Sequence, residues 1–255
     1  MKQDTFWSQI YERQLASVEP LDRQVCKLLD NFGKLGTQHE LVLDVGCGNG
    51  RFLDYLRARF GTAQAVGLDL SVAGLRSAER FGVFVVRSAA EHIPFRDSFF
   101  SAVICVHTLE HVIMFERVIE EIARVTSHGG KLLIITPNAI RNTHMVFWIG
   151  TLYEFMLADH VRTGFAFETL KAKLKKSGFQ LDTWGWYGFA GSFLGWIVRV
   201  CYQLPLKILG CRHGQTERRL SHATDAFVYK LELLDRLFST SNNKGANLYV
   251  IATRS

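Results

Sequence analysis

The sequence lacks the features that mark disulfide-stabilised, zinc-binding, secreted and membrane-spanning proteins. Its five cysteines are scattered along 255 residues and form no C-x-x-C pair, which argues against a disulfide framework and a cysteine-based metal site. The N-terminal stretch MKQDTFWSQIYERQL carries acids and no apolar core of signal-peptide length. The longest uncharged run in the C-terminal part, Thr183–Val198, has 16 residues, fewer than the roughly 20 that a membrane-spanning helix needs. We therefore expect a protein of the reducing cytoplasm, without a secretion signal or an N-terminal anchor.

Internal repeats and low-complexity tracts are also absent, whereas 48% of the residues are hydrophobic, enough for a large core. Apolar, β-branched segments alternate with helix-like ones, which is typical of a parallel sheet built from βαβ units. The pattern predicts an α/β fold in a single domain over residues 1–255. Helices are expected at 51–60, 72–81 and 115–126, the last ended by the glycines of SHGG, and strands at 41–47, 63–70, 83–88, 102–107, 131–136, 179–186 and 247–253.

The expected core, residues 41–137, is extended by three segments. Residues 1–40 read as helices that cap the sheet, and two apolar, aromatic stretches, 138–167 and 188–245, read as insertions. Within the second insertion, residues 189–209 have an apolar helical side with basic residues opposite it, which also fits a helix lying at a membrane surface. Three uses of the insertions stay open: a lid over a substrate, a peripheral membrane contact at the inner face of a membrane, and packing or a homodimer contact.

Charge is unevenly placed along the chain. Residues 1–159 hold 16 basic and 18 acidic residues, and residues 160–255 hold 14 and 6, which gives the two parts net charges of −2 and +8. A basic part of this kind can bind RNA, an anionic membrane or an acidic substrate, and it can equally be a solvated face.

The stretch LVLDVGCGNGRF, from Leu41 to Phe52, reads as a buried strand, a tight turn and the first turn of a helix, where α/β folds bind cofactors. The glycines have the spacing G-x-G-x-G, not the G-x-G-x-x-G of dinucleotide sites. Asp44 precedes them, where a carboxylate would repel a pyrophosphate and suit a cationic cofactor. Asp69 ends the next expected strand, where an acid can accept hydrogen bonds from both ribose hydroxyls. Together these residues favour S-adenosylmethionine over NAD.

Four stretches of the sequence resemble class I S-adenosylmethionine-dependent methyltransferases, in particular the group with the ubiquinone and menaquinone biosynthesis methyltransferases and many small-molecule and lipid methylases. They are VLDVGCGNGRF, GLDLS, AAEHIPFRDSFFSAVICVHTLEHV and RVTSHGGKLLIITPN. The resemblance implies a Rossmann-like, seven-stranded, mostly parallel sheet with a reversed last strand and helices on both faces. It also implies S-adenosylmethionine as the cofactor and S-adenosylhomocysteine as its product.

Position by position, the resemblance assigns cofactor-binding residues and reveals two departures. The family's usual acid for the adenine amino group is replaced here by Ala89, and the acid of its FDVV motif is replaced by Ser101. The adenine contact then falls to backbone groups or to Ser88 or Glu91. The cofactor-binding residues implied are Asp44, Gly46, Cys47, Gly48, Gly50, Asp69, Leu70, Ser71, Ala89, Ala90, Glu91 and Val106.

Catalysis of methyl transfer requires positioning and removal of a proton from the acceptor. His107 ends a predicted strand and is a suitable general base, although a packing or capping role explains it equally well. His111 and His160 are further catalytic candidates, while Glu110 and His111 in LEH can also serve to orient a loop. The motifs that DNA base methylases share after the fourth strand are missing, which disfavours DNA as a substrate.

The sequence thus favours a methyltransferase for a small or lipid-like acceptor, with O-methylation first and C-methylation next. A cofactor-binding scaffold without turnover and an RNA-modifying methyltransferase stay open as alternatives, and an NAD-dependent dehydrogenase remains a residual one. No metal site is expected, and the chain is expected to be a monomer or a homodimer.

Overall fold

The computed structural model describes residues 23–34, 41–61, 64–139, 161–162, 164–187 and 247–255. Its helices are α2 (Arg23–Gly33), α3 (Arg51–Phe60), α4 (Val72–Glu79), α5 (Phe115–Val125) and α7 (Phe167–Lys176), with a 3-10 turn, η1, at Leu109–His111. Its strands are β1 (Leu41–Val45), β2 (Gln64–Asp69), β3 (Phe84–Arg87), β4 (Phe100–Val106), β5 (Thr126–Pro137), β6 (Phe179–Tyr187) and β7 (Asn247–Arg254).

The chain divides into two compact units. One comprises residues 1–136, 165–184 and 249–255, and the other residues 137–164 and 185–248. The second unit nearly coincides with the two expected insertions, and most of it, including the amphipathic segment 189–209, lies outside the described residues. In the part of the chain that the structure describes, no helix is long and apolar enough to cross a membrane.

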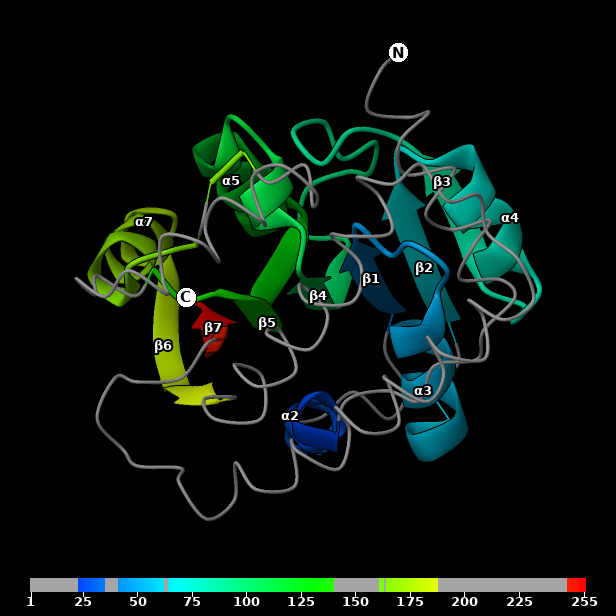
Figure 1. Cartoon of the computed structure of the whole chain (residues 1–255), viewed down its shortest axis with the longest axis horizontal. Helices are drawn as coiled ribbons and strands as arrows, with labels where there is room; N and C mark the ends of the chain where they lie inside the picture. The colour runs from blue at the N-terminus through cyan, green and yellow to red at the C-terminus, as the bar shows by residue number, and fades with distance from the viewer. Residues whose placement is uncertain (1–22, 35–40, 62–63, 140–160, 163, 188–246) are drawn as a thin grey trace, which may run out of the picture. The chain divides into compact units, whose positions relative to one another are not determined.

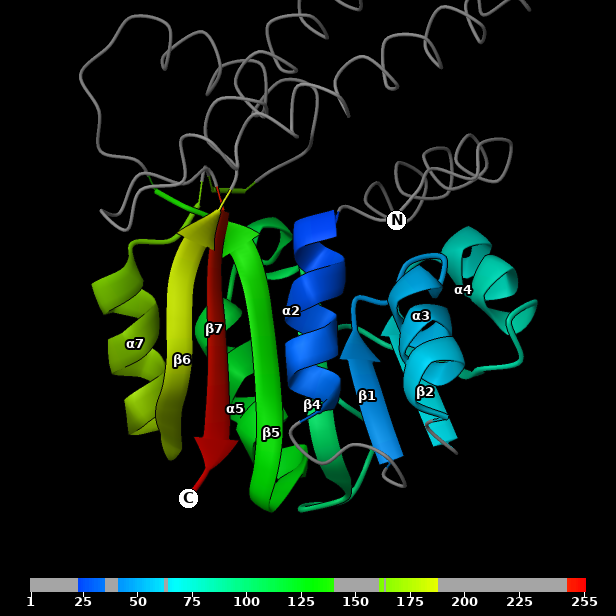
Figure 2. The ribbon, with the colours of Figure 1, turned by 90° about the horizontal axis from the view of Figure 1, so that it is seen from below.

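The seven strands form one sheet in the order β3-β2-β1-β4-β5-β7-β6. The pairs β3–β2, β2–β1, β1–β4 and β4–β5 are parallel, and β7 runs the other way (Figure 2). The expected sheet with a reversed last strand is therefore confirmed. Strand order changes direction between β1 and β4, and in open α/β sheets this is where a crevice forms at the carboxyl ends of the strands.

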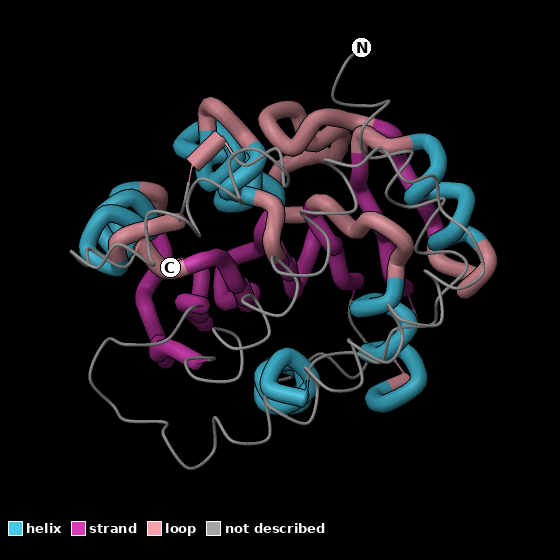
Figure 3. The backbone as a smooth tube through the Cα atoms, viewed as in Figure 1, coloured by secondary structure: helices cyan, strands magenta, loops and turns pink. Residues whose placement is uncertain are grey.

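Helices cover both faces of the sheet (Figure 1). The helices α2 and α3 lie on one face, α5 and α7 lie on the other, and α4 lies beside β2 and β3. Figure 3 shows the strands as a continuous layer between these helices. The central strands β1 and β4 are almost entirely buried, as expected for parallel strands covered on both faces.

Residues next to α3 and α4 set where α3 begins and ends and where α4 begins. Gly50 precedes α3 with a φ of 79°, and Gly61 follows it with a φ of 63° and donates its N–H to Arg57 O, so both ends use the left-handed region open to glycine. Ser71 caps α4, because its Oγ accepts a hydrogen bond from Gly74 N at 3.3 Å.

The end of α5 corrects the sequence-based expectation. The helix ends at Val125, and Thr126 is already extended, with its Oγ1 donating to Ile122 O at 2.6 Å. The glycines of SHGG therefore do not stop the helix. Gly129, with a φ of 76°, lies in β5, where the pairing with β4 shifts register between Phe100 and Ala102. These glycines serve a bulge at the start of β5, which begins at Thr126 and not at Lys131.

Candidate functional site

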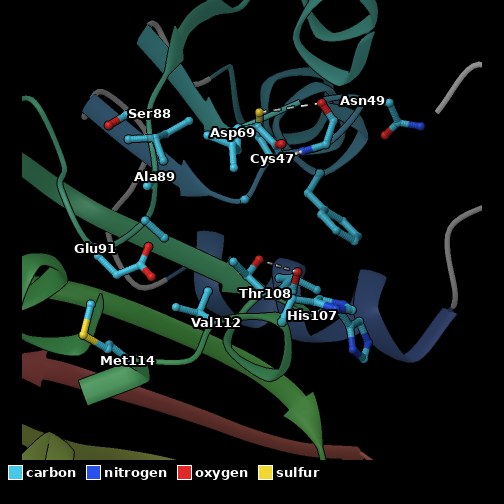
Figure 4. A pocket seen from close by; sticks show the side chains of 18 of the residues that line it. Cys47, Asn49, Asp69, Ser88, Ala89, Glu91, His107, Thr108, Val112 and Met114 are labelled. Atoms are coloured by element: carbon cyan, nitrogen blue, oxygen red, sulfur yellow. Dashed lines mark hydrogen bonds between the residues drawn. The ribbon is translucent and has the colours of Figure 1, made fainter. Parts of the chain in front are cut away.

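A cavity of about 490 Å³ opens at the carboxyl ends of β1, β2 and β4, a size typical of small-molecule sites. Its wall comes from the loops after these strands, from the loop after β3, and from the segment between η1 and α5 (Figure 4). It is lined by Gly46, Cys47, Gly48, Asn49, Arg51, Phe52, Leu68, Asp69, Leu70, Ser88, Ala89, Ala90, Glu91, Val106, His107, Thr108, His111, Val112, Ile113 and Met114.

The glycine loop between β1 and α3 forms one side of the cavity. Gly46, Gly48 and Gly50 have φ values of 77°, 53° and 79°, a region that other residues enter only with strain. A side chain at Gly46 would collide with Thr108, and one at Gly50 would lie 2.7 Å from Ala78 Cβ. Glycine is therefore required both for the turn and for its close packing against the loop after β4 and against α4.

Asp69 anchors this loop from the end of β2. Its Oδ2 accepts a hydrogen bond from Gly48 N, and its Oδ1 accepts one from Ser71 N, both at 2.8 Å. A carboxylate has about four acceptor positions, so the side chain can hold these two amides and two hydroxyl groups of a ligand. In Figure 4 Asp69 lies next to Cys47 in the cavity wall. The arrangement fits the role in ribose binding that the sequence predicts.

Asp44 lies beneath the glycine loop and does not line the cavity. It is fully buried in the centre of β1, where it pairs with Gly67 of β2 and Ile104 of β4. Among the described residues, neither carboxylate oxygen has a hydrogen-bond partner. Burial raises the pKa of Asp44 well above its usual value, and the nearby charge of Asp69 raises it further. A buried carboxyl of this kind calls for a proton or for a cation close by.

A network on α5 holds the loop that follows β3. Glu121 accepts a hydrogen bond from Ile93 N at 3.0 Å. The guanidinium of Arg124 donates to Ile93 O at 2.8 Å and to Phe95 O at 2.7 Å, and it pairs with both Glu121 and Asp97. This loop begins with the cavity-lining residues 88–91, so the network fixes one wall of the site from behind.

His107 stands at the end of β4 in the left-handed region, with a φ of 51°, where histidine is among the more tolerated side chains. The backbone N–H of His107 donates to the backbone O of Ile135 at 2.8 Å and so extends the pairing with β5 beyond the end of β4. Its Nδ1 lies 3.1 Å from Oε1 of Glu110. His111 also lines the cavity, from η1, and His160 lies outside the described residues.

The structure thus gathers most of the predicted site residues around one cavity. Asp44, Gly50 and Ser71 are exceptions, because Asp44 and Ser71 are buried and none of the three lines it. Their assignment to the cofactor stays a prediction, as does every ligand contact of the others.

Sequence reasoning missed Thr108, whose Oγ1 donates to Val45 O at 3.0 Å, and the apolar segment Val112–Met114. The side chains of Ile113 and Met114 are 73% and 57% exposed and lie at the cavity. The uncharged residues that follow the LEH sequence were the available signal for this apolar rim. Asn49, Arg51, Phe52 and Leu68 were missed as well.

Comparison with known proteins finds a methyltransferase domain in this chain. Residues 43–134 match the family model described as a methyltransferase domain. The phthiotriol/phenolphthiotriol dimycocerosates methyltransferase 1 of Mycobacterium ulcerans is 38% identical over 96 residues, which are 36% of this chain and 35% of the relative. The fatty-acid O-methyltransferase of Mycolicibacterium smegmatis is 36% identical over 96 residues, with the same two shares. The demethylmenaquinone methyltransferase of Thermobifida fusca is 37% identical over 102 residues, 37% of this chain and 42% of the relative. The match thus spans less than half the length of each relative.

Solved structures resemble most of the chain in fold. A SAM-dependent methyltransferase from Archaeoglobus fulgidus covers 91% of this chain and 93% of its own length, with a TM-score of 0.60 and 17% identity. The [4+2]-cyclase SpnF covers 90% and 81%, with a TM-score of 0.56 and 20% identity. The expected class I methyltransferase fold is confirmed. Because a cyclase shares it, the fold alone does not identify the reaction.

The residues present fit S-adenosylmethionine, the cofactor that the family implies. The glycine loop leaves backbone close to the cavity, and Asp69 offers acceptor positions for ribose hydroxyls. Asp44 lies buried beneath this loop and outside the cavity lining, so its contact with the cofactor stays a prediction. Ala89 lines the cavity where the family usually has an acid, and Glu91 and Ser88 line it nearby. These two residues are the polar side chains available there for an adenine.

Proposed function

Because the chain carries a methyltransferase domain at residues 43–134, we propose that the protein is an S-adenosylmethionine-dependent methyltransferase acting on a small, lipid-like or quinone-like acceptor. The observation that carries the proposal is that one cavity has both a polar wall and an apolar wall. The glycine loop and Asp69 form a polar wall suited to a nucleoside, and the segment Val112–Met114 forms an exposed apolar one.

The apolar wall supports an acceptor with a hydrocarbon or ring system. Large exposed apolar side chains at a cavity mouth gain free energy when a ligand covers them. Relatives named for dimycocerosate, fatty-acid and menaquinone substrates support the same class. Oxygen is the favoured target atom, with carbon next, because an acceptor hydroxyl needs a base and His107 lines this cavity.

Bound S-adenosylmethionine would supply a methyl group activated on a sulfonium. The protein's own contribution is then to place the acceptor and to receive its proton. Asp69 and the glycine loop would hold the nucleoside, and the rim at Ile113 and Met114 would hold the apolar acceptor. Contact of the segment 189–209 with a membrane surface belongs to the same proposal, since it would give the protein access to a lipid-linked acceptor.

Calorimetric titration with S-adenosylhomocysteine, beside NADH, tests the cofactor. We expect micromolar binding of the nucleoside thioether, no NADH signal, and loss of binding in Asp69→Ala. Asp182→Ala is the matched control, because Asp182 is an exposed carboxylate on β6 and does not line the cavity. A folded wild-type protein that binds no S-adenosylhomocysteine would refute the proposal.

Turnover is then measured with radiolabelled S-adenosylmethionine and a panel of fatty acids, phenols and quinols, with and without liposomes. Methyl transfer to a member of this panel supports the acceptor class. Cofactor binding without transfer to any acceptor points instead to a scaffold without turnover, for which the replacement of the usual acids by Ala89 and Ser101 is the motivating observation. Salt-dependent retention of RNA, with methylation of it, would favour the RNA-modifying alternative.

A further inference from the structure

A buried carboxylate lies directly behind His107. Glu110, in η1, is only 1% exposed. Its Oε1 is 3.1 Å from Nδ1 of His107, and its Oε2 accepts a hydrogen bond from Oγ1 of Thr136 at 3.3 Å. Both oxygens are thus engaged, one by the loop after β4 and the other by β5. Burial of an acid is costly unless it is hydrogen-bonded, and here His107 and Thr136 supply those hydrogen bonds.

The carboxyl of Glu110 is held in its ionised form. Burial raises the pKa of Glu110, but the hydrogen bond and charge of His107, the charge of His111 and a backbone hydrogen bond together outweigh burial and leave the pKa below its usual value. An ionised carboxylate can only accept hydrogen bonds. The hydrogen bond to His107 therefore requires a ring proton on Nδ1, and in the neutral imidazole this leaves Nε2 as an acceptor.

The two edges of the His107 ring face different surroundings. The Nδ1 edge meets the buried carboxylate, whereas the side chain as a whole is 42% exposed and lines the cavity. Figure 4 shows His107 beside Thr108 at the cavity wall. The left-handed backbone at His107 turns the chain sharply after β4, which brings the ring within reach of a residue only three positions later. The geometry leaves the Nε2 edge as the side open to a ligand.

We propose that Glu110 is a positioning residue that fixes His107 in the tautomer protonated on Nδ1, so that Nε2 receives the proton of an acceptor hydroxyl. This inference rests on the proposed methyltransferase function. In the step, the acceptor oxygen forms a bond to the methyl carbon, the bond between that carbon and sulfur breaks, and the hydroxyl proton moves to Nε2 and later to water. The imidazolium so formed lies beside the carboxylate of Glu110, which stabilises it.

Other ionisable groups around Glu110 do not replace it in this role. His111 adjoins it in η1 and contributes positive charge to it. Cys105, on β4, has its pKa raised by burial first and then by the charges of Glu110 and Asp44, so it remains a neutral thiol. Thr136, on β5, contributes an uncharged donor. Glu110 is therefore the charged group bonded to the His107 ring.

The tautomer of His107 can be read directly by NMR of protein labelled with ¹⁵N-histidine. The signal among the nine histidines is assigned by comparison with His107→Gln. We expect the Nδ1-protonated tautomer in the unmodified protein and a loss of this preference in Glu110→Gln, whose neutral amide can both donate and accept. The same hydrogen bond would fix this tautomer if the role of Glu110 were purely structural, so the tautomer tests the positioning of His107 and the kinetics below test its use in catalysis.

Kinetics supply the second readout. We expect Glu110→Gln to lower kcat about 100-fold, within the range of general-base catalysis, to shift the acid limb of its pH profile to lower pH, and to leave affinity for S-adenosylhomocysteine unchanged. Thr136→Val should show a smaller loss of the same kind. Glu116→Gln, an identical change at an exposed position on α5, is the control and should retain wild-type values.

The result that overturns the inference is the Nε2-protonated tautomer in the unmodified protein, or an unchanged rate and tautomer in Glu110→Gln. Either result would leave the proposed function intact if S-adenosylhomocysteine still binds and methyl transfer continues. Should Glu110→Gln fail to fold, the tautomer of His107 in the unmodified protein, assigned by comparison with His107→Gln, still tests the inference without any acceptor.

Discussion

Gly46 and Thr108 lie in the loops after β1 and β4, which are neighbours in the sheet, and they pack so closely that a β-carbon on Gly46 would lie 2.6 Å from Cγ2 of Thr108. Gly46 also has a φ of 77°. Gly46→Ala should therefore suffer both backbone strain and overlap, with a loss of about 2 to 4 kcal/mol in the free energy of unfolding.

Urea unfolding measures this loss, and Gly61→Ala is its control. Gly61 has a φ of 63°, but no atom lies within 4 Å of the position that a β-carbon would take there, so only the backbone cost of about 1 kcal/mol is expected. Thr108→Ala should recover part of the loss at Gly46. Equal losses at Gly46 and Gly61 would show that the overlap with Thr108 is relieved without cost.

Asp44 should make stability depend on pH. Its pKa is raised in the folded protein, so the folded state keeps a proton that the unfolded chain releases above about pH 4. Its contribution to the free energy of unfolding therefore falls as pH rises, by up to about 1.4 kcal/mol per pH unit. Asp44→Asn has no such proton, and its stability relative to wild type should increase between about pH 5 and pH 8.

The comparison requires urea unfolding of both proteins across that pH range. Asp54→Asn, in the first turn of α3, gives the baseline for the same chemical change elsewhere. If the difference between wild type and Asp44→Asn stays constant with pH, the carboxyl of Asp44 is ionised throughout the range in the folded protein.

Arg124 should be irreplaceable by lysine. Its guanidinium reaches Ile93 O, Phe95 O, Glu121 and Asp97 at once, and an ammonium group cannot make this planar set of bonds. We expect Arg124→Lys to lose about 1 to 3 kcal/mol of stability and the amide of Ile93, which donates to Glu121, to exchange faster with solvent. Arg96→Lys serves as the control, because Arg96 lies over the ring of Phe99 on the same loop and is not part of the network on α5. An unchanged exchange rate of the Ile93 amide in Arg124→Lys would show that Arg124 does not hold this loop in place.

The apolar rim should act on the acceptor and not on the cofactor. If the proposed function holds, Ile113→Ser and Met114→Ser should each raise KM for an acyl or quinol acceptor about 3- to 10-fold, as expected for about 1 kcal/mol of lost apolar burial. Affinity for S-adenosylhomocysteine should not change. Phe84→Ser is the matched control, since Phe84 is 64% exposed but lies on β3 and does not line the cavity. If Phe84→Ser raises KM for the acceptor as much as Ile113→Ser and Met114→Ser do, the apolar rim is not part of the acceptor site.

Much of the fold could be predicted because its signals are local. The strands β1 and β4 are each a largely apolar run, the glycines follow β1 directly, and Asp69 ends the next strand. The boundary at Thr126 could not be found in this way. Glycine after a helix usually stops it, whereas here Gly129 serves the pairing of β5 with β4, a contact between segments distant in sequence.

The sequence predicted which loops form the site, but it did not predict several contacts between their side chains. The role of Glu110 depends on Thr136, 26 positions away, and on the left-handed turn at His107, neither of which has a signature in the sequence. Asp44 is predicted to bind the cofactor, which stays a prediction, and the sequence alone did not reveal that the residue is fully buried between β2 and β4. Burial of this kind is a property of the whole sheet and not of the motif around the residue.

The change of direction in strand order between β1 and β4 separates the cavity lining into two groups of segments. Loops after β1, β2 and β3 supply the polar wall, and the segments after β4 supply His107, Glu110 and the apolar rim. If the proposed function holds, substitutions on the β4 side should alter acceptor binding and proton transfer and leave the wall proposed to bind the nucleoside unchanged. Gly46 and Thr108 are in contact where the two groups meet, so a larger side chain at either position would displace the other loop.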